Sequence, residues 1–117
     1  MPGSERSYAP FDVVVVPFPY VDRLAEKRRP ALIVSSDRLA GQGIIWVVMI
    51  TSAANPQRED DVPIADLRGA GLHAPSVIRS AKIATIEPHR IIRRAGALDR
   101  ASARQVVRAL QKYMAAE

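Results

Sequence analysis

The chain has 117 residues, of which 48% are hydrophobic and 25% charged, a composition typical of one folded domain with a real core. Cysteine is absent, which excludes disulfides, thiolate metal sites and a cysteine nucleophile and favours a reducing compartment. No apolar run approaches the ~20 residues of a membrane helix, and the polar N-terminus has no signal-peptide core, so we expect a cytoplasmic protein that does not enter a membrane.

The net charge is +5, and its excess lies late in the chain. Between Arg79 and Lys112 there are nine lysines and arginines against two acidic residues. Arginine outnumbers lysine 14 to 3. Its flat guanidinium binds phosphate through two hydrogen bonds, so this bias suits a surface that contacts nucleic acid. A GC-rich genome gives the same bias without functional meaning, and composition alone does not separate the two.

Residues 1–10 read as a flexible tail, and residues 11–117 as a single domain. The first predicted strand, over residues 11–18 (FDVVVVPF), is β-branched and almost entirely apolar, which indicates burial. The second is predicted over residues 30–36, with Pro30 as its first residue because proline disrupts the middle of a sheet. Two strands so close in sequence most simply pair antiparallel.

The third predicted strand, over residues 44–51 (IIWVVMIT), is the most apolar segment and should lie at the centre of the sheet, with Trp46 in or beside the core. One turn region is predicted at residues 37–43, before the third strand, and another in the glycine-rich stretch 68–75. Further strands are predicted over residues 60–65, as a short edge strand, and over residues 76–86 and 88–98.

A single helix is predicted over residues 99–116, with Asp99 as its N-cap. One apolar stripe runs along it at three- and four-residue steps, through Ala103, Val106, Val107, Leu110, Tyr113 and Met114. Short strands followed by one helix predict a mainly β fold, a small closed or half-closed barrel with the C-terminal helix packed on it.

Few residues offer catalytic chemistry. The two histidines, His73 and His89, lie in no cluster with metal-ligand spacing, and the acidic run 59–61 is typical of a solvated edge. What remains is a set of arginines and hydroxyls at strand ends, namely Arg29, Thr51, Ser52 and Arg79. Cations and hydroxyls around one pocket are suited to binding phosphate, and such donors stabilise the charge that builds on a phosphate during RNA cleavage.

In its order of motifs the chain resembles the PemK/MazF family, the toxins of bacterial toxin–antitoxin pairs. The resemblance covers most of the chain from Phe11 to the C-terminal helix. It is carried by the segments DVVVVPF at 12–18, RPALIVS at 29–35, ITS at 50–52, SVIR at 76–79 and KIATI at 82–86.

The resemblance implies an SH3-like barrel that forms a homodimer, binds a cognate antitoxin and uses no metal or other cofactor. It further implies a sequence-specific endoribonuclease that cleaves single-stranded mRNA by 2′-OH attack, leaving 2′,3′-cyclic phosphate and 5′-OH ends. Arg29 matches the arginine of the family's Arg-Pro motif, and Thr51 matches the hydroxyl that holds the scissile phosphate. Arg79 matches a second catalytic arginine that some members use.

Two departures from the family pattern bear on catalysis. Ala81 stands where some members have an acid two places after the second arginine, and residues 21–28 replace a glycine-containing loop. The general base is therefore left open between Arg29, Glu26 and His73, although an arginine, with a pKa above ~12, rarely gives up a proton. The candidates for binding RNA outside the catalytic set are Ser52, Lys27, Arg28, Lys82, Glu26 and His73.

Two non-catalytic alternatives stay open. In one, the barrel inhibits a protein target, as the related gyrase-poisoning toxins do. In the other, it is a degenerate member that binds only RNA or its antitoxin, and Ala81 adds weight to this one. The RNA sequence recognised depends on loop shapes, and residues 20–28 and 53–59 are the loops we expect to set it.

Overall fold

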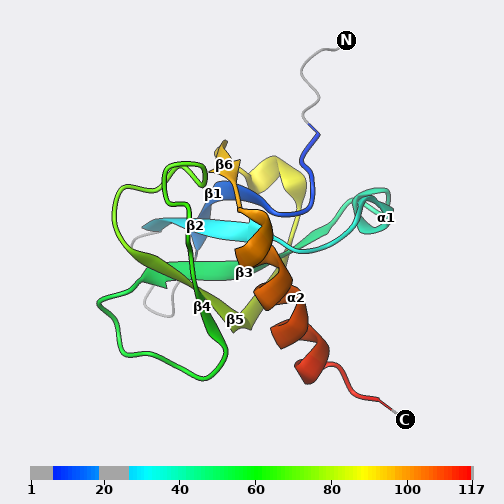
Figure 1. Ribbon diagram of the computed structural model, residues 1–117. Coiled ribbons are helices and arrows are strands. Elements are labelled where there is room, and N and C mark those ends of the chain that lie inside the picture. Colours follow the sequence, from blue (N-terminus) through cyan, green and yellow to red (C-terminus); the bar gives the residue numbers. More distant parts are fainter. Residues whose placement is uncertain (1–6, 19–26, 117) are drawn as a thin grey trace.

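The computed structural model describes residues 7–18 and 27–116, and this part of the chain is built on one antiparallel sheet with a helix across it (Figure 1). Its strands are β1 (Asp12–Phe18), β2 (Lys27–Ile33), β3 (Ile45–Ser52), β4 (Asp61–Pro63), β5 (Ser76–Ile86) and β6 (Arg93–Ala97), in the spatial order β4-β5-β3-β2-β1-β6. The helices are α1 (Asp37–Ala40), the 3₁₀ turn η1 (Pro88–Arg90) and α2 (Arg100–Tyr113). The mainly β prediction is confirmed, with the third strand at the centre of the sheet and the strand within residues 60–65 at an edge.

The sheet buries apolar residues on both faces, because successive side chains of a strand point to opposite sides. Val13 packs in one cluster with Val106 of α2, whereas Val14 and Val16 pack in another. We call the side covered by α2 the helix face and the opposite side the far face. The all-valine run of β1 is therefore buried on both sides, as its sequence predicts.

The barrel is half closed by the glycine-rich turn that follows β4. Ala97 N donates a hydrogen bond of 2.9 Å to Gly69 O, which ties this turn to β6. A Cβ atom at Gly96 would collide with the backbone of Gly69 and Ala70. Glycine at position 96 thus lets the two ends of the sheet approach each other without direct pairing of β4 with β6.

The prediction that Pro30 begins the second strand is wrong, since β2 begins at Lys27 and Pro30 pairs with Val15 in its middle. The reason lies in the neighbouring strand. β3 pairs with β2 only over Ala31–Ile33, so the first half of β2 has β1 as its single paired neighbour. Proline is tolerated where one side of a strand lacks a partner.

Three further expectations differ from the structure. Trp46 is 42% exposed although it lies on the same face of β3 as the buried Val48 and Ile50, because the core on that face does not extend to the start of the strand. Residues 37–40, expected as a turn, form a single helical turn whose N-cap, Ser36, accepts a hydrogen bond from Arg38 N. The last strand is shorter than predicted because the chain from Pro88 first makes a 3₁₀ turn.

The C-terminal helix begins as predicted, with Asp99 accepting a hydrogen bond of 2.9 Å from Ser102 N, and ends at Tyr113. Its apolar stripe is wider than the surface it covers, because Val106 is fully buried but Val107 and Tyr113 are 37% and 47% exposed. None of the helices in the described part is long and apolar enough to cross a membrane.

Candidate functional site

The strand register places Arg29 and Thr51 at the same end of β2 and β3, just beyond the residues that pair. Ala31 of β2 pairs with Met49 of β3, and continuing this register by two residues sets Arg29 level with Thr51. Arg29 also pairs with Val16 of β1, which lies on the far face, and alternation along β3 puts Thr51 on that face as well. Both side chains are half-buried. The two residues of the sequence prediction thus lie on one face at one end of the sheet.

The hydroxyl of Thr51 is held by the loop that follows it. The side-chain amide of Asn55 donates a hydrogen bond of 2.6 Å to Thr51 Oγ1. Since this bond uses an oxygen lone pair, the hydroxyl hydrogen stays available for an acceptor such as a phosphate oxygen. Ser52 shapes the same turn, because its Oγ accepts a hydrogen bond of 3.1 Å from Ala54 N.

Arg79 lies on the same face, opposite Met49 of β3 and Asp61 of β4. Its Nη2 donates hydrogen bonds of 2.9 Å to Asp61 Oδ2 and to Pro56 O, and its Nε donates one of 3.3 Å to Asp61 Oδ1. The side chains of Arg79 and Asp61 are only 11% and 3% exposed. Arg79 therefore anchors the β3–β4 loop next to Asn55.

The expectation that the acidic run 59–61 is a solvated edge is wrong for two of its members. Asp61 is buried against Arg79, and its Oδ2 also accepts a hydrogen bond of 2.9 Å from Arg58 N. Asp60 Oδ1 and Oδ2 accept hydrogen bonds of 2.9 Å each from Lys112 Nζ and Tyr113 Oη. The hydrogen bond from Lys112, then that from Tyr113, holds the pKa of Asp60 below its usual range, and the same bonds raise the pKa values of both donors.

A bulge in β5 borders the site. Met49 pairs with Arg79 and Val48 with Ile83, so Ser80, Ala81 and Lys82 are inserted opposite a single step of β3. Bulges are frequent next to active sites, where they redirect side chains. Ser80 Oγ is buried and finds no hydrogen-bond partner in the part of the chain that the structure describes, whereas Ala81 and Lys82 are exposed. Ala81 offers no carboxylate here, and Asp61 supplies one to Arg79 from β4 instead.

The model of the PemK-like, MazF-like toxins of type II toxin–antitoxin systems matches residues 9–114. The chain belongs to this toxin family. No curated protein sequence matches it.

Solved structures of MazF toxins share the fold. MazF (Form-I) from Deinococcus radiodurans is 19% identical with a TM-score of 0.73, over 93% of this chain and 97% of that one. Mycobacterium tuberculosis toxin MazF-mt6 is 22% identical with a TM-score of 0.67, over 86% and 93%. An endoribonuclease in complex with its cognate antitoxin from a mycobacterial species is 17% identical with a TM-score of 0.71, over 91% and 93%.

Not all predicted site residues of this toxin meet at Thr51. Arg28 and His73 line a separate cavity, together with Pro30 and residues of β1 and β6. Lys27 is exposed at the start of β2, and Glu26 lies outside the described residues. His73 is thus not placed beside Thr51 as a general base would be, and the part of the chain that is described contains no group of three or more His, Cys, Asp or Glu residues that could hold a metal ion.

Asn55 and Asp61 are the site residues that sequence reasoning missed. The Asn55-Pro56 pair indicated only a loop, and Asp61 stood within an acidic run at a predicted edge strand. The pairing of the predicted edge strand with β5 is the signal that could have identified Asp61, because in that register Asp61 lies opposite Arg79.

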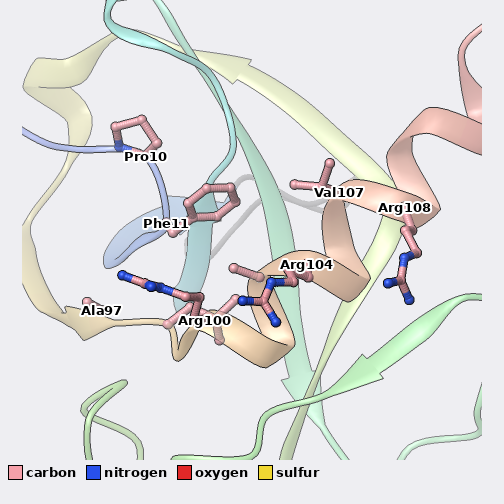
Figure 2. Close-up of a pocket in the computed structure, with 9 residues that line it drawn as sticks. Pro10, Phe11, Ala97, Arg100, Arg104, Val107 and Arg108 are labelled. Carbon is pink, nitrogen blue, oxygen red and sulfur yellow. The ribbon is translucent and has the colours of Figure 1, made fainter.

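The toxin also has a larger cavity away from Thr51, of about 650 Å³, between the start of β1 and α2. Figure 2 shows Arg100, Arg104 and Arg108 of α2 beside Phe11 and Val107 at this cavity. None of its described lining residues carries a hydroxyl or a carboxylate, so among these residues it has no counterpart of the Thr51 hydroxyl.

Proposed function

We propose that this toxin is a metal-independent endoribonuclease that cuts single-stranded mRNA at specific sequences. The 2′-oxygen of the ribose forms a bond to the adjacent phosphorus, and the bond from phosphorus to the 5′-oxygen of the next nucleotide breaks. The 2′-OH loses a proton and the departing 5′-oxygen gains one. The products are a 2′,3′-cyclic phosphate end and a 5′-OH end.

The observation that carries this proposal is the Thr51 hydroxyl, fixed by Asn55 at 2.6 Å and level with Arg29 on the same face. During the attack, negative charge builds on the two non-bridging phosphate oxygens. The Thr51 O–H donates to one of them and the Arg29 guanidinium stabilises the charge on both. Donors fixed in advance are effective because they need no reorganisation as the charge develops, and one such donor contributes about 10²–10³ in rate.

The proton transfers need an acceptor and a donor. The Asp61 carboxylate is buried and bonded to Arg79 and Arg58 N, so its role is to orient Arg79 rather than to move protons. His73 lines another cavity. Glu26 lies outside the described residues. We assign both transfers to water at the site, with Arg29 acting through its charge and Arg79 as a positioning residue for the loop that carries Asn55.

The proposal includes a cognate antitoxin and a homodimeric state. The antitoxin is supported by family membership and by the mycobacterial endoribonuclease that was solved with its cognate antitoxin. The dimer is supported by the exposed apolar part of the α2 stripe, since Val107, Tyr113 and Met114 are left outside the core of one chain.

Cleavage of a long single-stranded RNA by the purified protein in EDTA tests the proposal. Wild type should give discrete cuts whose 5′ ends a kinase labels directly. Arg29→Ala and Thr51→Val should each lower the rate by about 10²–10³. Arg68→Ala, which removes the same charge from an exposed turn, is the matched control and should cut like wild type. Intact RNA with wild-type protein across several unrelated transcripts would overturn the nuclease assignment.

A second function, binding of RNA or antitoxin without cleavage, is favoured by one observation. The position two residues after Arg79 is Ala81, and the guanidinium of Arg79 is engaged by Asp61 and Pro56 O. This function predicts that wild type binds single-stranded RNA in EDTA, leaves it intact and does not inhibit growth. Growth inhibition without cleavage points instead to a protein target.

A further inference from the structure

The cavity lined by Arg28 and His73 opens on the helix face of the sheet, the face opposite to that of Arg29. Its volume is about 330 Å³, and its lining combines the apolar Val15, Leu72 and Ile92 with the cationic or titratable Arg28, His73 and Arg93. None of its described lining residues carries a carboxylate. Pockets for small ligands begin at about 300 Å³, so the space suits one nucleotide rather than a longer segment.

The strand register fixes where the two arginines stand. Arg93 of β6 pairs with Val15 of β1, and Val15 pairs with Pro30 of β2, so these three residues form one row across the sheet. Arg28 lies two positions before Pro30, so its side chain is on the same face of β2. Adjacent strands are about 4.8 Å apart, so two strands separate the backbones of Arg93 and Pro30 by roughly 10 Å. The cavity lies between two cations that rigid strands hold on opposite sides.

These two arginines differ from their neighbours in charge pairing. Arg94 forms an ion pair of 3.0 Å with Asp12, and Arg79 is paired with Asp61. Across residues 7–18 and 27–116, no acidic side chain forms an ion pair with Arg28 or Arg93. Two guanidinium groups around one cavity without a counter-charge attract an anion, and phosphate matches their hydrogen-bonding geometry.

The position of the cavity relative to Thr51 points to RNA. Arg28 and Arg29 are consecutive in β2, so their side chains leave on opposite faces of the same strand end. The proposed position of the scissile phosphate at Arg29 and the cavity beside Arg28 therefore lie at the same end of β2. Unpaired nucleotides are splayed apart and placed in separate pockets when proteins recognise single-stranded RNA.

We propose that this cavity binds one nucleotide of the RNA next to the cleavage site, with its phosphate between Arg28 and Arg93 and its base against His73, Leu72 and Ile92. The proposal rests on the function proposed above. It adds a specificity subsite to that function and assigns Arg93, which no sequence motif indicated, to RNA binding.

The test measures how binding of a short single-stranded RNA depends on salt. The probe is the 2′-O-methyl form of a segment that wild type cuts, which cannot be cleaved because the attacking hydroxyl is blocked. Arg93→Gln and Arg28→Gln should each lower the slope of log affinity against log salt by about 0.7, the value for one lost phosphate contact on a single strand. Arg68→Gln, an exposed arginine outside the cavity, should leave the slope unchanged.

A second readout is the sequence at the cut sites. Arg93→Gln should still cut RNA but with relaxed preference at one position next to the scissile phosphate, while Arg68→Gln keeps the wild-type pattern. Slopes and cut sites of Arg93→Gln that match those of Arg68→Gln would overturn the subsite while the nuclease stands. Wild-type protein that cuts no RNA would overturn the proposed function first, so the two failures are distinct.

Discussion

The side-chain nitrogen of Asn55 lies 2.6 Å from the hydroxyl oxygen of Thr51, four residues earlier in the chain. The loop that carries Asn55 is itself tied to the sheet, because Pro56 O accepts a hydrogen bond of 2.9 Å from Arg79 Nη2. One buried arginine of β5 thereby fixes a loop amide, and that amide fixes the orientation of a hydroxyl at the end of β3. The Thr51 hydroxyl, the proposed hydrogen-bond donor to the phosphate, is therefore oriented by contacts of the loop behind it.

Replacement of Asn55 should lower the cleavage rate without unfolding the protein. Asn55→Ala frees the Thr51 hydroxyl to rotate, and misplacement of a reacting group lowers rates by up to roughly 10²-fold. Asn55→Asp should be worse, because its carboxylate accepts the Thr51 hydrogen and repels the phosphate. Asn55 is exposed, so stability should change by less than about 0.5 kcal/mol. Single-turnover cleavage beside urea unfolding checks both, and an Asn55→Asp variant as fast as wild type would remove Asn55 from the site.

Breaking the Arg79–Asp61 pair should destabilise the fold. The two side chains are 11% and 3% exposed, so Arg79→Met leaves a buried carboxylate without its cation. Such half-broken pairs lose about 3–5 kcal/mol. The double variant Arg79→Met/Asp61→Leu removes both charges and should recover much of that loss. Urea unfolding of wild type, Arg79→Met, Asp61→Leu and the double variant gives the coupling energy, and simple additivity of the two single changes would contradict a direct pair.

The elements of the fold were largely predictable because local signals agree with the tertiary structure. The valine run of β1, the apolar β3 and the Asp99 N-cap each fix an element without reference to the rest of the chain. Pro30 and Trp46 failed for one shared reason, since their environment depends on neighbouring strands. Pro30 is tolerated where β3 no longer pairs with β2, and Trp46 is exposed because the core that buries Val48 and Ile50 on the same face does not extend to the start of β3.

The candidate site was predictable only where it lies on paired strands. The order and pairing of β2 and β3 place Arg29 and Thr51 at one end of the sheet and on one face, and their role at the phosphate stays a prediction. Asn55 and the acidic run could not be placed, because their contacts depend on a loop conformation. Asp60 adopts a positive φ of 63°, and the two consecutive carboxylates diverge, Asp60 toward α2 and Asp61 toward Arg79. From sequence alone a run of charged residues is expected to be exposed to solvent, and only the conformation of the turn shows that two of these residues are not.

The contact between Asp60 and the end of α2 should depend on pH in a defined direction. The hydrogen bonds from Lys112 and Tyr113 lower the pKa of Asp60 below its ordinary value. A lowered pKa means that the contact stabilises the fold above the unfolded value and is lost as the pH falls through the folded one. The hydrogen bond to Asp60 raises the pKa of Tyr113 above its ordinary value, so the contribution of this bond to stability is lost as the pH rises through that raised pKa.

Asp60→Asn isolates this contribution. The difference in unfolding free energy between wild type and the variant should be constant near neutral pH and should shrink below pH 4, in parallel with the carboxyl titration followed by NMR. Tyr113→Phe should raise the pKa of Asp60 toward its ordinary value without abolishing the contact with Lys112. A difference that stays constant down to the acid limit would show that the contact contributes nothing to stability.

The arginines of α2 are spaced so that they repel one another. Arg100, Arg104 and Arg108 lie four residues apart beside the larger cavity (Figure 2), and α2 contains no acidic residue. Like charges at this spacing destabilise a helix by about 0.2–0.5 kcal/mol per pair. Arg104→Glu turns two repulsive pairs into two attractive ones and should stabilise the protein by roughly 1 kcal/mol, or about 4 °C in Tm.

Arg104→Gln, which removes the repulsion without adding attraction, should show about half of that gain. The gain should shrink at 1 M salt, where charges are screened within about 3 Å. Thermal unfolding of the three proteins at low and high salt measures it. An Arg104→Glu protein that melts at the wild-type temperature in low salt would mean that these guanidinium groups are already neutralised by contacts between chains, and the same scan repeated over protein concentration would reveal them.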